Sequence, residues 1–327
     1  MSSEYIIKKV SLSNFNKFKN IFPNISIFSE PLWISNVINT SSKTFGNKAF
    51  YLLAEKNKFP IAVMPICYRK IFGKKILLMP YFTPYFDISF AKTYKKTYKN
   101  NSIKKQIFGI FIDFLIKNGF IFGFFSINHD FIDFQPAIWR NILVYPRYTY
   151  IHKASDNILS SISGNLKNDI KFAKKNGISI KESENIMEFI PIWKKTLKRQ
   201  EVSRIYEDVL LKLFESLKKT KKIKLFIAYD KNMKAISGCI IANDQKSSYY
   251  IAGADTREIR GSGSLGIVHA ILDSIENGLD FDFEGSMIEG IEKYFRKFGG
   301  QLTPYFNMSS LSLQTLLKIK KILSIGY

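Results

Sequence analysis

One pattern of elements is predicted twice along this chain, in the same order each time. An apolar run, a short polar turn and a second apolar run occur over residues 52–64 and again over residues 226–239. Further along each half, a helical pattern is closed by Asn-Gly and followed by an apolar strand pattern, over residues 111–122 and 271–281. Elements that recur in a fixed order indicate a duplicated unit. The sequence therefore predicts two copies of one α/β unit.

Each copy is expected to contain a β-hairpin, a further strand, a helix and a closing strand, which gives a mixed, largely antiparallel sheet flanked by helices. The 327 residues are enough for two such domains, and we place the N-terminal domain at 1–150 and the C-terminal domain at 151–327. No apolar stretch approaches the roughly 18 residues of a membrane-spanning helix. The first residues lack the pattern of a signal peptide, so a cytoplasmic location is expected.

The two copies differ in the closing strand. Asp282 and Glu284 stand in the second copy where Gly123 and Phe125 stand in the first. Residues i and i+2 share one face of a strand, so both carboxylates are expected on one face, and the phenylalanines that alternate with them are expected in the core. The second copy is therefore predicted to be the active half, and the first copy a degenerate partner that supports it.

A basic turn with two glycines precedes the last long helical pattern. A strand at 249–254 leads into this turn, and a helix is expected from about 265 to 277. The free N–H groups of a helix N-terminus attract anions, and glycine lets a phosphate approach the backbone closely. The turn has neither the Walker spacing nor that of a dinucleotide-binding loop, and an ordinary connecting turn is the alternative. The residues expected to bind the phosphates of a donor are Arg257, Gly261, Ser262, Gly263 and Ser264.

The charge of the chain is strongly positive. It carries 49 Lys and Arg against 27 Asp and Glu, a formal net charge of +22. Such a field attracts polyanions, which include tRNA, coenzyme phosphates and an anionic membrane surface. Cys67 and Cys239 lie in apolar runs and are expected to be buried thiols. The three histidines are too scattered to predict a metal site.

The succession of strand, Arg- and Gly-containing turn, helix and strand resembles the core of the GNAT acyltransferase fold. The resemblance is sharpest to the FemAB-like branch, whose members are tandem GNAT proteins. It covers nearly the whole chain and is densest from about residue 148 to residue 305. The residues that carry it are 148–150, 165–175, 198–200, 249–250, 281–286 and 290–300. The fold implied is α/β, with two tandem GNAT-like domains.

This resemblance implies direct transfer of an acyl group to an amine. We expect an N-acyltransferase that takes the group from a thioester donor, acyl-CoA, and passes it to an amine of a cell-envelope sugar, peptide or related metabolite. GNAT enzymes place two residues between the Arg or Gln of the turn and its first Gly, whereas three residues separate Arg257 from Gly261. The donor therefore stays open between acyl-CoA and aminoacyl-tRNA. The alternatives are an aminoacyl-tRNA-dependent peptidyltransferase acting on a peptidoglycan precursor, and a non-catalytic polysaccharide-assembly protein.

Direct transfer needs a base and groups that hold both substrates. We nominate Glu284 as the residue that receives or orients the acceptor amine, with Asp282 beside it. The alternative is that both acids only stabilise the scaffold. Substrate contacts are also expected at the end of the helix at 188–200, on the strand before the basic turn, and in a cleft between the domains. These residues are Arg199, Gln200, Tyr249, Tyr250, Tyr81, Tyr85 and Asp87.

Overall fold

The computed structural model describes residues 5–40, 48–92, 96–202 and 206–310. The chain forms two compact units. Among the described residues, unit 1 holds those up to Pro146 and those from Tyr305 onward, and unit 2 holds Arg147–Pro304. The sequence-based boundary at residue 150 lies close to this division, but the return of the chain to unit 1 at Tyr305 has no counterpart in the sequence-based domains.

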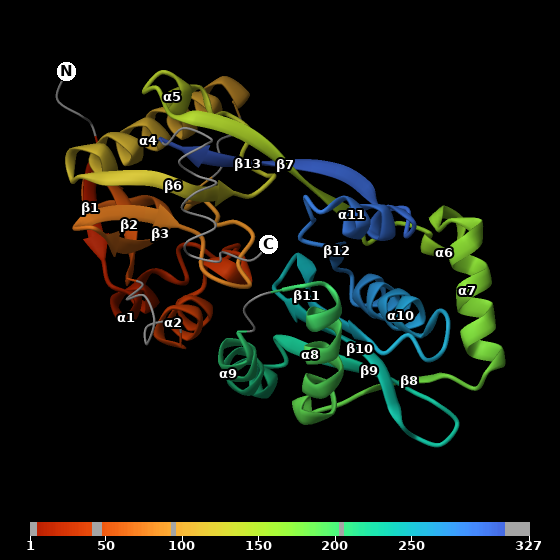
Figure 1. Cartoon of the computed structure of the whole chain (residues 1–327). Helices are drawn as coiled ribbons and strands as arrows, with labels where there is room; N and C mark the ends of the chain where they lie inside the picture. Colours follow the sequence, from red (N-terminus) through yellow and green to blue (C-terminus); the bar gives the residue numbers. More distant parts are fainter. Residues whose placement is uncertain (1–4, 41–47, 93–95, 203–205, 311–327) are drawn as a thin grey trace. The chain divides into compact units, whose positions relative to one another are not determined.

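Unit 1 is built on one mixed sheet (Figure 1). Its strands lie in the order β1-β2-β3-β4-β6-β13, and β5 pairs with β3. Among its described strands, β4 and β6 form the parallel pair, and the helix α4 lies between them in the chain. Its elements are β1 (Ile6–Val10), α1 (Leu12–Phe15), η1 (Asn16–Phe18), η2 (Ile27–Ser29), α2 (Pro31–Thr40), β2 (Lys48–Lys56), β3 (Phe59–Ile71), β4 (Lys74–Leu78), β5 (Ser89–Phe90), α4 (Thr97–Lys117), β6 (Phe120–Ile127), α5 (Gln135–Ile138) and the end of β13 (Gln301–Ser309).

Unit 2 has a sheet of the same topology, in the order β8-β9-β10-β11-β12-β7. Its one parallel pair among the described strands is β11 and β12, and the helix α10 connects them. Its elements are the end of β7 (Leu143–His152), α6 (Ile158–Ser161), α7 (Gly164–Lys175), β8 (Ser179–Glu182), η3 (Ile186–Glu188), α8 (Ile190–Arg199), α9 (Glu207–Leu217), η4 (Lys218–Thr220), β9 (Ile223–Tyr229), β10 (Ala235–Asn243), β11 (Ser247–Asp255), α10 (Ser262–Glu276), β12 (Asp280–Asp282) and α11 (Glu289–Arg296).

The pairings of the two sheets match step by step, from two antiparallel hairpin strands through a parallel pair to a closing antiparallel strand. This confirms the predicted duplication, and each unit is the predicted mixed, largely antiparallel sheet flanked by helices. The closing strand of each sheet comes from the other half of the chain. β7 follows the elements of unit 1 and completes the sheet of unit 2, and β13 follows α11 and completes the sheet of unit 1.

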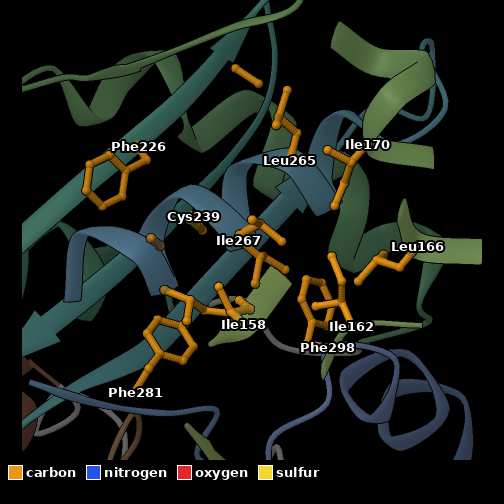
Figure 2. Close-up of a cluster of buried hydrophobic side chains, with 14 of the residues drawn as sticks. Ile158, Ile162, Leu166, Ile170, Phe226, Cys239, Leu265, Ile267, Phe281 and Phe298 are labelled. Carbon is orange, nitrogen blue, oxygen red and sulfur yellow. The ribbon is translucent and has the colours of Figure 1, made fainter. Parts of the chain in front are cut away.

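Helices cover both faces of the sheet in unit 2. Cys239 on β10 points to α10, where its thiol lies 3.7 Å from the carbonyl oxygen of Gly266. The next residue back, Gly238, faces Phe189, which directly precedes α8. Adjacent residues of a strand point to opposite faces, so α8 and α10 pack on opposite sides. Figure 2 shows the core on the α10 side, where side chains of α7 and α10 belong to one buried cluster with Phe226 and Phe281.

Cys67 and Cys239 are both buried free thiols, as predicted, and burial raises the pKa of Cys239 to about 12. In the described part of the chain, no helix combines the length and the apolar character that crossing a membrane requires.

Candidate functional site

The strands β11 and β12 part in the middle of the unit 2 sheet. Their parallel pairing ends at Tyr249 and Asp282, where β12 stops, while β11 continues to Asp255. Beyond Asp282 the chain follows β7 instead, and the N–H of Phe283 donates to the carbonyl of Tyr150 over 3.1 Å. Among the described residues, the later part of β11 therefore has a strand partner only on its β10 side.

A β-bulge lies on β11 just past this point. The register with β10 shifts between Ile240 and Ile241, which leaves Ile251 outside the pairing. Bulges are common beside active sites, because they change the direction of a strand and of its side chains. The unpaired backbone edge next to the bulge can accept or donate hydrogen bonds to an extended ligand.

Glu284 follows the end of β12 in a tight turn. Its φ is 57° and that of Gly285 is 73°, so both residues adopt the left-handed conformation. The predicted strand through residue 284 is therefore wrong in its last two residues, because this turn ends the extended backbone at Asp282. The phenylalanine prediction holds, since Phe281 and Phe283 are both buried in the core with ring centroids 5.1 Å apart.

One oxygen of the Glu284 carboxyl group is buried, although the residue as a whole is half-buried. Its Oε1 atom is shielded from solvent and has no hydrogen-bond partner within the described residues. Burial, and next the charge of Asp282, raise the pKa of Glu284 well above its usual value of 4.5. A carboxyl group in this setting is a stronger base than an exposed one, and strongly perturbed groups cluster at functional sites.

Asp282 has a different environment from Glu284. It is buried, and its Oδ1 accepts hydrogen bonds from the hydroxyl of Thr149 at 2.5 Å and from the N–H of Glu284 at 2.7 Å. The cations of α11 pair elsewhere, Lys293 with Glu289 and Arg296 with Glu292. Asp282 therefore holds the turn in place and supplies the charge that acts on Glu284.

Gly285 fixes the turn against β7. A Cβ atom at this position would lie 1.9 Å from the carbonyl oxygen of Tyr148 and 2.9 Å from the Cα of Thr149. These are backbone atoms of a paired strand, so they cannot move aside cheaply. Glycine is required both by its φ and by this close approach.

Two tyrosines lie near the point where the strands part. The ring of Tyr250 packs against Phe283 at 6.1 Å and Phe295 at 5.6 Å. Burial, followed by weaker effects that include nearby Tyr294, raises the pKa of Tyr250 well above 10.0. The hydroxyl of Tyr294, on α11, lies 3.0 Å from that of Ser264. Both phenols stay protonated at neutral pH and can donate a hydrogen bond. Tyr294 belongs to the motif at 290–300 but was not among the predicted site residues.

The predicted donor turn begins beside an acid that sequence reasoning missed. The carboxylate of Asp255, the last residue of β11, accepts hydrogen bonds from the N–H of Arg257 at 2.8 Å and from the hydroxyl of Ser262 at 3.3 Å. Burial raises the pKa of Asp255, and its hydrogen bonds and the charge of Arg199 oppose the shift. An Asp at a strand end that bonds the N–H two residues on is an Asx turn, which its position in the sequence could have indicated. Gly261 caps α10 with a φ of 83°.

The four residues expected to contact substrate in unit 2 are not brought to one point. Arg199 lies at the far end of β11, where its Nη2 donates to the carbonyl of Asp255 at 3.0 Å. Gln200 is exposed at the end of α8. The hydroxyl of Tyr249 donates to Asp244, before the start of β11, at 2.9 Å. Of the four, Tyr250 lies next to the turn that carries Glu284.

The three residues expected to contact acceptor in unit 1 lie in its interior. Tyr81 and Tyr85 are buried, and Tyr85 packs against Tyr305 with ring centroids 5.2 Å apart. Asp87 accepts hydrogen bonds from the N–H of Ser26 at 2.5 Å and from the side-chain amide of Asn128 at 2.7 Å. Each has a structural role in unit 1, and their role in binding stays a prediction. Within the described residues, no three His, Cys, Asp or Glu side chains gather as a metal site would require.

Solved structures share this fold. FemX aligns with a TM-score of 0.67 at 14% sequence identity, over 96% of this chain and 99% of that chain. The C-terminal domain of a putative lysylphosphatidylglycerol synthetase from Agrobacterium fabrum aligns with a TM-score of 0.59 at 10% identity, over 94% of this chain and 95% of that one. L-PGS from Bacillus licheniformis aligns with a TM-score of 0.54 at 8% identity, over 87% and 95%.

No family model and no curated protein matches the chain in sequence. The structural likeness is one of fold: the chain shares the fold of FemX and of the synthetase domains, which agrees with the α/β fold of two tandem domains that the resemblance implied.

Proposed function

We propose that unit 2 catalyses direct transfer of an acyl group to an amine, with Glu284 as the base. The observation that carries the proposal is the buried Oε1 atom of Glu284, which has no hydrogen-bond partner in the described chain and sits where β11 and β12 part. Burying a carboxyl group without a partner is unfavourable, so a protein that retains one has a use for it. Taking a proton from the attacking amine is such a use.

The reaction balances with one base and one proton donor. The amine nitrogen attacks the carbonyl carbon of a thioester or ester, the new C–N bond forms, and the C–S or C–O bond breaks. Glu284 takes the proton that the nitrogen loses, and the departing sulfur or oxygen takes a proton. The hydroxyls of Tyr250, whose ring packs against Phe283, and of Tyr294 stay protonated, and they suit this second step.

The unpaired edge of β11 supports the binding part of the proposal. Backbone groups next to the bulge at Ile251 can hold a donor in an extended conformation, with its carbonyl near the turn that carries Glu284. No covalent enzyme intermediate is needed, which agrees with the burial of Cys239 and the raised pKa of its thiol.

The nature of both substrates belongs to the proposal. The acceptor we favour is an amine of a cell-envelope sugar, peptide or related metabolite, and the structures of FemX and of the synthetase domain share the fold of the chain. The donor is acyl-CoA or an aminoacyl ester on tRNA, for which the charge of +22 is favourable. Contact with an anionic membrane surface and a cytoplasmic location stay predictions.

A transfer assay with mass-spectrometric detection tests the proposal. Purified protein is incubated with acetyl-CoA and longer acyl-CoA thioesters, or with a charged tRNA mixture, together with amino sugars and cell-wall peptides. The expected product is an amide of matching mass. Glu284→Gln should lower the rate by about 10²–10⁴-fold while the fold is retained, which is the usual contribution of general acid–base catalysis.

Glu215→Gln is the matched control, because Glu215 is an exposed acid of unit 2 on α9 that pairs with Lys218 and lies outside the predicted site. It should leave the rate unchanged. Equal rates in Glu284→Gln and the wild type would remove Glu284 from the mechanism. No amide with any donor would favour the non-catalytic alternative.

A further inference from the structure

A carboxylate of this protein, that of Asp255, lies against the start of α10. A Cβ atom on Gly263 would lie 2.8 Å from Oδ2 of Asp255, so the carboxylate rests directly against the first turn of the helix. Its other oxygen accepts the hydrogen bonds from Arg257 and Ser262. A carboxylate at a helix N-terminus is stabilised by the same free N–H groups and dipole that would bind a phosphate.

This contact explains why a glycine stands at position 263 without any bound ligand. A glycine in such a turn predicts the close approach of an anion to the backbone, and here the anion that approaches is the carboxylate of Asp255. A diphosphate placed on the N–H groups of the first turn of α10 would meet the negative charge of Asp255 beside Gly263. Like charges at that separation in a partly buried site repel strongly.

Several cations near the turn already have partners in the protein, so they are not free to offset this repulsion. Arg260 is held by Asp169, with its Nε 2.6 Å from the carboxylate, and Lys234 is held by Glu258 at 2.7 Å. Arg199 donates to the backbone carbonyl of Asp255. Arg260 and Lys234 are therefore balanced by other acids of unit 2, while the charges of Arg199 and Arg257 act on Asp255 itself.

We infer that Asp255 keeps diphosphate groups off the β11–α10 turn, so that this protein recognises its acyl donor without a diphosphate at the N-terminus of α10. The inference rests on the proposed function for the existence of a donor. It deepens that proposal by limiting the donor to one whose binding places no diphosphate at this turn. The sequence predicted that the phosphates of a donor bind at this turn, and a diphosphate there requires the Asp255 carboxylate to be removed.

Two probes test the inference, inorganic pyrophosphate and free coenzyme A. Each is titrated into ¹⁵N-labelled protein while the backbone N–H signal of Gly263 is followed by NMR. In the wild type the signal should not move at millimolar probe. In Asp255→Asn, which keeps the acceptor oxygen for the N–H of Arg257 and loses the charge, both probes should shift the signal with an affinity at least tenfold higher.

Asp230→Asn is the control variant, because Asp230 also accepts backbone N–H bonds in a turn of unit 2, from Asn232 and Lys234, but belongs to the turn between β9 and β10. It should behave as the wild type does. If Asp255→Asn unfolds, Asp255→Ser replaces it.

A saturable shift of Gly263 in the wild type would overturn the inference, and so would the absence of any gain in the Asp255 variants. Neither probe is an acyl donor, so the two experiments are independent. A negative result in this titration does not affect the transfer assay, and a negative transfer assay does not change the interpretation of the titration.

Discussion

Gly285→Ala should destabilise unit 2 more than any other glycine-to-alanine change in the turn and helix that follow β12. The new side chain would hold a non-glycine residue at a φ of 73°, which costs about 1–2 kcal/mol. Its Cβ would also overlap the carbonyl oxygen of Tyr148 at 1.9 Å, so β7 and the turn must separate. Overpacking of this kind adds about 1–3 kcal/mol.

The two effects together predict a loss of about 3 kcal/mol in the free energy of unfolding. For a domain of this size that corresponds to a fall in melting temperature on the order of 6–12 °C. Urea unfolding followed by fluorescence and by circular dichroism measures it.

Gly290→Ala is the matched control, five residues further on. Gly290 lies in the first turn of α11, and a Cβ there would meet no atom within 4 Å. Alanine should stabilise the helix by about 0.5–1 kcal/mol. Equal effects of the two substitutions would refute the account of the turn, because they would show that Gly285 is not held against β7.

Three further predictions concern buried polar groups of unit 2. Glu284 has a raised pKa in the folded state, so stability present below pH 4.5 is lost as the pH rises through that pKa. Glu284→Gln should therefore raise the unfolding free energy at pH 8 and leave it little changed at pH 4, as urea unfolding at both pH values will show. Thr149→Val removes a hydrogen bond to the buried carboxylate of Asp282 and should cost about 1.5–3 kcal/mol at pH 7 in the same measurement. His152 is fully buried with a lowered pKa, so its protonation favours unfolding below pH 6.5; the loss of stability between pH 7 and pH 5 should shrink in His152→Phe.

The repeated unit could be predicted because its signals are local. Apolar runs with short polar turns specify the hairpins β2–β3 and β9–β10, and the Asn-Gly pairs specify the ends of the helices α4 and α10 within a few residues, although α4 begins at Thr97, well before the predicted helical pattern. The exchange of closing strands could not be predicted in this way. β7 and β13 pair with strands far away in sequence, and nothing in an apolar run states which sheet it will join.

The candidate site was found in part for the same reason. Asp282 and Glu284 stood out because acids are rare in a buried strand, but the left-handed backbone of Glu284, a conformation uncommon outside glycine, has no sequence signal of its own. Asp255 could not be predicted as a site residue from the glycines and cations of the turn, which indicate an anion-binding loop. The position of its carboxylate depends on the fold of the whole turn around α10.

A carboxyl titration of Glu284 tests the central claim most directly. Protein labelled with ¹³C at the glutamate carboxyl carbons is followed by NMR from pH 3 to pH 10, and the Glu284 signal is assigned by its loss in Glu284→Gln. The account predicts a midpoint well above 4.5, which moves down when Asp282→Asn removes the neighbouring charge. A midpoint at or below 4.5 would contradict it, because a carboxyl group that ionises so readily is neither buried without a partner nor suited to take a proton from an amine.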